Sequence, residues 1–252
     1  MLEVCVDSVE SAVAARAGGA DRLELCAALV IGGISPTTAL YGAVRRRVDL
    51  PIRAMVRPRF GDFLYTDAEK EIMLAEAREW CTLGVEGVVT GALTPDGRLD
   101  VPFLRDFAEA AGGLRRTLHR AFDLCADPFA ALEDAIALGF DTILTSGQQS
   151  SCRKGAALIA ALRRRAAERI EILVGAGVDA AAVRDLRPVT GCTAFHMSGK
   201  VTLESGMVFR REGVPMGLPG LDEYSVWRTD AERVRAAHTA VSAGLPFTSC
   251  TS

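Results

Sequence analysis

The sequence predicts an α/β protein with a TIM-like (β/α)8 barrel, formed by a single domain that spans residues 1–252. Short apolar runs of strand type alternate with helical patterns along the whole chain, which is typical of a parallel sheet. Successive strands begin about 20 to 36 residues apart, the length of one βα unit. A chain of 252 residues also has the usual length of one such barrel. An open doubly wound sheet is the alternative, but no Gly-x-Gly-x-x-Gly motif follows the first strand.

Each predicted strand is an apolar run that leads into a turn or a helix start. The expected strands are 2–7, 22–27, 52–57, 87–92, 116–121, 142–146, 171–176 and 194–198. The expected helices lie near 8–18, 37–48, 66–83, 101–111, 128–138, 155–167, 179–187 and 229–243. Ser8, Thr66 and Asp127 are good N-terminal caps, and Gly84 and Gly139 are good C-terminal ends. The stretch 200–222 contains glycine and proline, so we expect a long loop there, suited to a lid.

Composition and charge exclude several classes of partner. The formal net charge of −3 and the pI near 5.7 offer no basic surface for nucleic acid. No apolar stretch approaches the roughly 18 residues of a membrane span, so we expect a cytoplasmic protein with no membrane partner. The seven cysteines include no CxxC pair and are scattered along the chain. We therefore expect reduced thiols and no structural zinc, and no motif indicates an organic cofactor.

A Glu-x-Cys motif occurs in each of the first two predicted strands. Every second side chain of a strand points to the same face, so Glu3 shares a face with Cys5, and Glu24 with Cys26. If the two strands pair in like positions, Cys5 and Cys26 lie side by side above the two carboxylates. Two thiols about 5 Å apart are soft ligands that suit a soft metal ion. The alternative is that both cysteines are small buried residues that fill a layer of the barrel.

The carboxylates of this motif would be buried, and a buried charge is costly unless it is paired. Arg57, on the third strand, has the same inward parity and is the expected counter-charge for Glu3 and Glu24. Such a cluster is either a structural ion pair or a catalytic group. A catalytic role requires one carboxylate with a raised pKa.

Chemistry in a parallel barrel belongs at the C-terminal ends of the strands, where this chain places many polar side chains. Arginine forks bind carboxylate or phosphate, imidazole transfers protons near neutral pH, and glycine lets a phosphate approach the backbone. The candidate catalytic residues are Glu24, His119 and Asp123. The candidate anion-binding residues are Arg57, Arg59, Asp62, Ser146, Gly175, Gly177, His196 and Ser198. For Arg57, Arg59 and Asp62 the alternative is a solvated salt-bridge loop. For His119 it is a hydrogen-bonded core histidine, and for the glycine-containing strand ends it is simple turn geometry.

A series of motifs in fixed order resembles the CutC family from residue 1 to about residue 245. The motifs are LEVC at 2–5, GADRLELC at 19–26, GGISP at 32–36, VRPR at 56–59, GDF at 61–63, LHRAFD at 118–123, ILTSG at 143–147 and GAGV at 175–178. The resemblance implies a TIM-like barrel, a cytoplasmic location, a homodimer and a role in copper homeostasis. It also implies Cys5 and Cys26 as the Cu(I) ligands. Relatives often carry an acidic residue two positions before His196, where this chain has Ala194.

Two functional hypotheses follow. The first is a copper-homeostasis protein that binds Cu(I) through Cys5 and Cys26 in the barrel mouth. The second is an enzyme that acts on a small anionic or phosphorylated metabolite, with copper binding incidental. In the second, Arg57 and Arg59 hold the anion, and His119 or Glu24 transfers protons.

Overall fold

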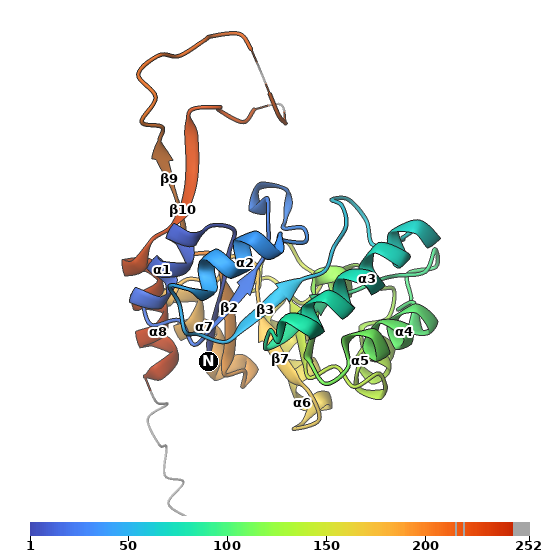
Figure 1. Cartoon of the computed structure of the whole chain (residues 1–252). Helices are drawn as coiled ribbons and strands as arrows, with labels where there is room; N and C mark the ends of the chain where they lie inside the picture. The colour runs from blue at the N-terminus through green and yellow to red at the C-terminus, as the bar shows by residue number, and fades with distance from the viewer. Residues whose placement is uncertain (215, 219, 244–252) are drawn as a thin grey trace, which may run out of the picture.

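The computed structural model describes residues 1–214, 216–218 and 220–243, and its centre is a closed barrel of eight parallel strands (Figure 1). The strands are β1 (Leu2–Val6), β2 (Arg22–Leu25), β3 (Ile52–Met55), β4 (Gly87–Thr90), β5 (Arg115–Leu118), β6 (Thr142–Thr145), β7 (Glu171–Val174) and β8 (Ala194–Met197). They pair in sequence order, and β8 pairs with β1 to close the barrel. The predicted TIM-barrel fold is confirmed.

Helices surround the barrel, one after each strand. They are α1 (Val9–Ala17), α2 (Thr38–Arg45), α3 (Asp67–Leu83), α4 (Val101–Ala111), α5 (Pro128–Ala137), α6 (Ala156–Ala166), α7 (Ala180–Thr190) and α8 (Ala231–Ser242). Two short 3-10 helices, η1 (Leu29–Ile31) and η2 (Arg120–Leu124), follow β2 and β5. Among the described residues, no helix is both long and apolar enough to cross a membrane.

The helix boundaries follow the capping residues that the sequence offers. Ser8 caps α1 by accepting a hydrogen bond from the backbone N–H of Ser11. Thr66 and Glu69 form a reciprocal capping box at the start of α3, and Gly84 ends that helix in the left-handed conformation. Asp127 accepts from two backbone N–H groups at the start of α5. These predicted boundaries are confirmed.

The alternation of side chains along each strand separates an apolar shell from a polar interior. Outward-facing residues such as Val4, Leu25 and Val88 pack with helix residues such as Trp80 and Phe107 in one large apolar core. Inward-facing positions carry Glu3, Cys5, Glu24, Arg53, Arg57, Thr117 and His119, all of them buried. This interior is unusual, because the layers inside such barrels are mostly filled by branched apolar residues.

The register of the first two strands differs from the simplest expectation. Cys5 lies opposite Glu24, and Glu3 lies opposite Arg22, so the like positions of the two Glu-x-Cys motifs are offset by two residues. The prediction that Cys5 pairs with Cys26, above a Glu3–Glu24 pair, is therefore wrong. Closing eight strands into a barrel requires neighbouring strands to be staggered, and a stagger of two residues keeps every side chain on its face.

The base of the barrel interior is held by ion pairs. Arg22 Nε lies 2.5 Å from Glu3 Oε2, so the counter-charge of Glu3 is Arg22 and not Arg57. Arg53 Nη2 lies 2.6 Å from Asp141 Oδ1, and Arg53 Nη1 donates to Thr142 Oγ1 at 2.9 Å. Burial opposes the ionisation of Glu3, but the charges of Arg22 and His196 outweigh it and hold its pKa at about 2. Glu3 is therefore a permanent buried anion.

An arm projects from the barrel where the sequence predicts a loop over 200–222. β9 (Lys200–Glu204) pairs antiparallel with β10 (Ser225–Thr229), and this hairpin extends away from the barrel in Figure 1. The all-loop prediction is corrected, because part of that stretch forms a strand whose partner lies beyond residue 222. Lys200 Nζ sits 3.3 Å from the ring centroid of Trp227, which ties the two strands together near the barrel.

We expect Arg22→Met to lower the free energy of unfolding by about 3–5 kcal/mol, because the substitution leaves Glu3 as a buried charge without its main partner. Equilibrium urea denaturation measures the change. The control is Arg165→Met, which removes an exposed ion pair with Glu133 and is expected to cost less than about 1 kcal/mol. Equal losses for the two variants would contradict the assignment of Arg22 as the partner on which Glu3 depends.

Candidate functional site

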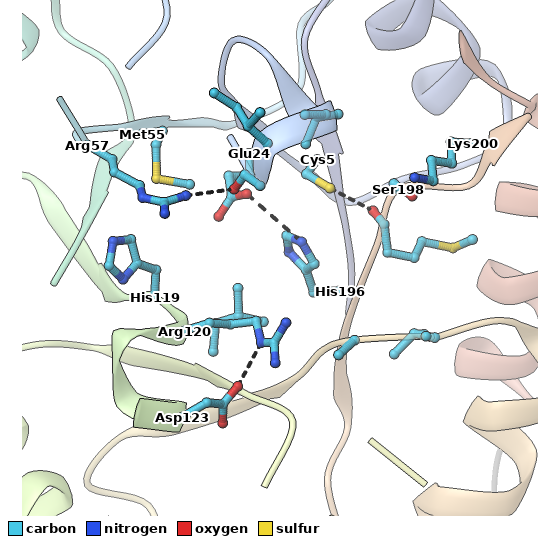
Figure 2. Close-up of a pocket in the computed structure, with 18 of the residues that line it drawn as sticks. Cys5, Glu24, Met55, Arg57, His119, Arg120, Asp123, His196, Ser198 and Lys200 are labelled. Carbon is cyan, nitrogen blue, oxygen red and sulfur yellow. Dashed lines mark hydrogen bonds and ion pairs between the residues drawn. The ribbon is translucent and has the colours of Figure 1, made fainter. Parts of the chain in front are cut away.

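A cavity of about 550 Å³ opens at the C-terminal end of the barrel strands (Figure 2). Its walls come from distant parts of the chain, including β1, β2, β3, β8 and the segment after β5. Of the residues predicted from the sequence, the cavity is lined by Cys5, Glu24, Arg57, His119, Asp123, Gly177, His196 and Ser198. The other candidates, which are not part of its lining, are Cys26, Arg59, Asp62, Ser146 and Gly175.

One side of the cavity brings a thiol, a carboxyl group and an imidazole together. A ligand atom from each of Cys5, Glu24 and His196 lies within 4.8 Å of the other two. His196 Nδ1 is 2.8 Å from Glu3 Oε1, and His196 Nε2 is 3.9 Å from Glu24 Oε2. Glu3 therefore orients the imidazole of His196 through Nδ1, and Nε2 of the same ring faces Glu24 in the cavity. We call Cys5, Glu24 and His196 the thiol cluster.

Burial and charge set the protonation of the thiol cluster. Burial raises the pKa of Glu24 to about 7, and the negative charge of Glu3 adds to this effect while His196 opposes it. Burial by itself would lower the pKa of His196, but Cys5, Glu24 and Glu3 favour its charged form and raise that pKa well above the usual range. Glu24 thus meets the sequence-based requirement for a carboxyl group that exchanges a proton near neutral pH.

Cys26 lies just beyond the thiol cluster. Its side chain is buried with Met55, Val89 and Leu29, and its sulfur lies 3.6 Å from the backbone oxygen of Val6. Burial raises the pKa of the Cys26 thiol well above its usual value, and charge on Cys5 raises it further. The charge of Cys5 therefore affects Cys26, although Cys26 packs in an apolar layer as the alternative interpretation describes.

The opposite side of the cavity in Figure 2 carries Arg57 and His119. His119 Nδ1 accepts the backbone N–H of Ala121 at 3.2 Å, which places the proton of the neutral ring on Nε2. Burial, aided by the positive charge of Arg57, lowers the pKa of His119 to about 3. His119 is consequently a neutral hydrogen-bond donor and not the proton shuttle that the sequence suggested.

Asp123 is committed to holding the loop after β6. Its carboxylate accepts from Thr145 Oγ1 at 2.5 Å and from the backbone N–H groups of Ser146 and Gln148 at 3.0 and 3.1 Å. Arg120 Nε pairs with it at 2.7 Å. The side chain therefore fills the group of backbone donors that a phosphate would use after this strand.

Arg59 and Asp62 form a clamp within the loop after β3. Arg59 donates to Asp62 Oδ1 at 3.0 Å, to Glu69 Oε1 at 2.6 Å and to the backbone oxygen of Leu64 at 2.8 Å. This is the arrangement of the salt-bridge alternative. Gly175 directly follows β7, and an added Cβ there would lie 2.6 Å from Leu144 Cδ1, so a larger residue requires that leucine side chain to move.

Two residues of the site escaped the sequence analysis. Lys200 lines the cavity two positions after Ser198, but it begins the hairpin and so lies outside the expected strand end. Arg22 orients Glu3 from the start of β2, a position that we treated as a strand boundary. The sequence does indicate this role, because Arg22 lies two residues before Glu24 on the same strand and therefore also points into the barrel.

These features define a TIM-barrel protein with a polar, thiol-containing cavity at the C-terminal mouth of its strands. The family model described as the CutC family matches residues 1–201, and the chain belongs to this family.

Known relatives agree with the assignment to the CutC family. A CutC family protein of Chromobacterium violaceum is 43% identical over 241 residues, which cover 96% of this chain and 98% of the relative. The human copper homeostasis protein cutC homolog is 44% identical over 236 residues, covering 93% of this chain and 86% of that protein. The crystal structure of CutC from Streptococcus agalactiae is similar with a TM-score of 0.73 and 28% identity, over 79% of this chain and 98% of that one.

We expect His119 to stay neutral, with its proton on Nε2, from pH 5 to pH 9, because its pKa is lowered to about 3. The unfolded chain binds a proton at this position below about pH 6.5 and the folded chain does not. Its contribution to stability is therefore complete above pH 6.5 and is lost as the pH falls from there toward 3. NMR of the ¹⁵N-labelled imidazoles follows the titration directly, since the chain has three histidines. A His119 titration midpoint near pH 6.5 would contradict the expected state.

Proposed function

We propose that this protein binds Cu(I) in the barrel mouth and serves copper homeostasis. The observation that carries the proposal is the thiol cluster, in which Cys5, Glu24 and His196 offer ligand atoms within 4.8 Å of one another. The name of the human relative supports the same role. Of the two hypotheses from the sequence, the relatives favour copper homeostasis over an enzyme of metabolite chemistry.

The chemistry of the donor set fits Cu(I). Thiolate and imidazole are ligands that copper accepts in proteins, and a carboxylate is a poor ligand for so soft an ion. We assign Cys5 as the central ligand, with Cys26 as the second thiolate predicted from the sequence and His196 as the neighbouring nitrogen donor. Glu24 then accepts a proton, because thiol and imidazolium must lose theirs when a metal binds. Its pKa of about 7 suits that exchange.

We expect wild-type protein to bind one equivalent of Cu(I), and Cys5→Ser to weaken this binding at least about a hundredfold by removing the central soft ligand. The measurement is an anaerobic titration against a competing Cu(I) chelator. Cys26→Ser is expected to weaken binding less, because Cys26 is buried in a cluster with Met55 and Val89 and is not part of the cavity lining. Cys192→Ser is the matched control, a buried thiol away from the cavity that should leave the affinity unchanged. Undiminished binding by the Cys5→Ser, Cys26→Ser double variant would rule out the thiolate site.

We also propose that the chain is a single domain that acts as a cytoplasmic homodimer. The hairpin arm supports self-association, since it exposes large apolar side chains far from the barrel. Val208 is 99% exposed, and Phe209 and Met216 are also largely exposed. Apolar groups gathered on a projecting segment are typical of a surface that another molecule covers.

We expect Val208→Ser combined with Phe209→Ser to convert the dimer to a monomer, because the substitutions remove apolar area from the surface that the second copy covers. Sedimentation equilibrium on both proteins reports the mass in solution. Leu124→Ser, an exposed apolar residue on the barrel, serves as the control and is expected to leave the mass unchanged. Wild-type protein that sediments as a monomer at all concentrations would refute the dimer.

A further inference from the structure

The cavity contains a polar group that the copper proposal does not use. His119 lies on the wall opposite Cys5 in Figure 2, with 3% of its surface exposed. The backbone N–H of Ala121 occupies Nδ1, so Nε2 carries the hydrogen. Nε2 has no hydrogen-bond partner within the part of the chain that the structure describes. A buried donor without an acceptor is costly, and at the wall of a cavity the missing acceptor is supplied by water or by a bound molecule.

The guanidinium of Arg57, which lies beside this donor, also lacks a counter-charge. Arg57 is 7% exposed, and its terminal nitrogens donate to the backbone oxygens of Gly33 at 2.9 Å and Gly61 at 3.0 Å. Within the described ranges, no carboxylate lies at ion-pair distance from Arg57, whereas Arg22 and Arg53 each have at least one. The carbonyl oxygens leave its net charge unbalanced, and its Nε has no hydrogen-bond partner among the described residues. A buried charge favours a partner of opposite sign.

Packing against the ring of Phe63 holds Arg57 and His119 in fixed positions relative to each other. The guanidinium of Arg57 lies 5.0 Å from the ring centroid of Phe63, and the rings of Phe63 and His119 are 4.8 Å apart. The imidazole also packs directly on Gly91, where an added Cβ would lie 2.7 Å from His119 Nδ1. The donor and the charge are therefore held in place before any ligand arrives, which lowers the entropic cost of binding.

We propose that this wall of the cavity is a binding site for a small monocarboxylate, with one carboxylate oxygen accepting the Nε2–H of His119 in the field of Arg57. The unmatched charge of Arg57 and two donors without partners among the described residues, His119 Nε2 and Arg57 Nε, suit the single charge of a carboxylate better than a phosphate dianion, which needs more donors. The backbone donors at Ser146 and Gln148 that would serve a phosphate already bind Asp123. A cavity of about 550 Å³ has room for a small acid. This site goes beyond the copper proposal and uses neither Cys5 nor Cys26.

The first test uses metal-free, reduced wild-type protein labelled with ¹⁵N in its histidines. Acetate and pyruvate are the probes, and acetamide is the uncharged control. We expect both acids, and not acetamide, to shift the Nε2 resonance of His119 in a saturable way. No shift at saturating acid would overturn the proposal. A shift produced by inorganic phosphate and not by acetate or pyruvate would overturn the assignment to carboxylates.

A matched pair of variants separates the two nitrogens of the ring. Asparagine places an oxygen near the position of Nδ1 and glutamine places an N–H near that of Nε2, so His119→Asn loses the cavity donor and His119→Gln keeps it. Calorimetry should show acetate binding weakened at least about tenfold in His119→Asn, the worth of one hydrogen bond to a charged group. His119→Gln should stay within about threefold of wild type. Equal affinities in all three proteins would overturn the proposal.

Cu(I) affinity measured on the same variants keeps this proposal distinct from the copper site. We expect both His119 variants to bind Cu(I) as wild type does, because the donor set at Cys5 lies across the cavity. Loss of copper binding without loss of acetate binding in either variant would overturn the assignment of His119 to the acid. If His119→Asn fails to fold, the shift of the His119 resonance in wild-type protein decides the question.

Discussion

The buried carboxylate of Glu3 is the interaction on which both the barrel and its cavity depend. Glu3 lies on β1 between Arg22 on β2 and His196 on β8, and it is paired in register with both. Its two oxygens contact the two cations at 2.5 and 2.8 Å. The strand pair that closes the barrel is therefore fixed by the same charge that orients the imidazole in the cavity. A buried anion is tolerated only while these partners stay in place, so closure of the barrel and the geometry of the site are linked.

The chain of charges above Glu3 explains why neighbouring groups of the site differ so much in pKa. Glu3 is ionised and favours the charged form of His196. Burial raises the pKa of Glu24 to about 7, and the charge of Glu3 adds to this effect while His196 opposes it. On the other wall, burial lowers the pKa of His119, and the positive charge of Arg57 lowers it further, so His119 is neutral. His196 is therefore charged and His119 is neutral, although both line the same cavity. The difference comes from which charge each one faces, since both are shielded from solvent.

Much of this arrangement can be predicted from the sequence. The parts that cannot be predicted have one physical cause in common. Alternation along each strand predicts the barrel, the inward direction of Glu3, Cys5 and Glu24, and the position of His119 at a strand end. Local alternation contains no information about stagger, which is a property of the whole closed barrel. The partner of Glu3 and the separation of Cys26 from the thiol cluster both depend on that stagger. The neutral state of His119 likewise depends on Arg57, which is distant in the sequence.

The two walls of the cavity suit different ligands, and this difference bears on how a metal would reach the thiols. Cys5 is buried in the cavity lining and its sulfur lies 3.6 Å from the backbone oxygen of Met197, so an ion reaches this thiol through the cavity and not at the outer surface. An ion carried by a small ligand would enter through the mouth, where Lys200 and Arg120 favour negative charge. An acid held at His119 would then lie across the same space from the thiol cluster. Binding of copper and binding of an acid are therefore expected to be coupled through the shared volume of one cavity, even though their ligand atoms are separate.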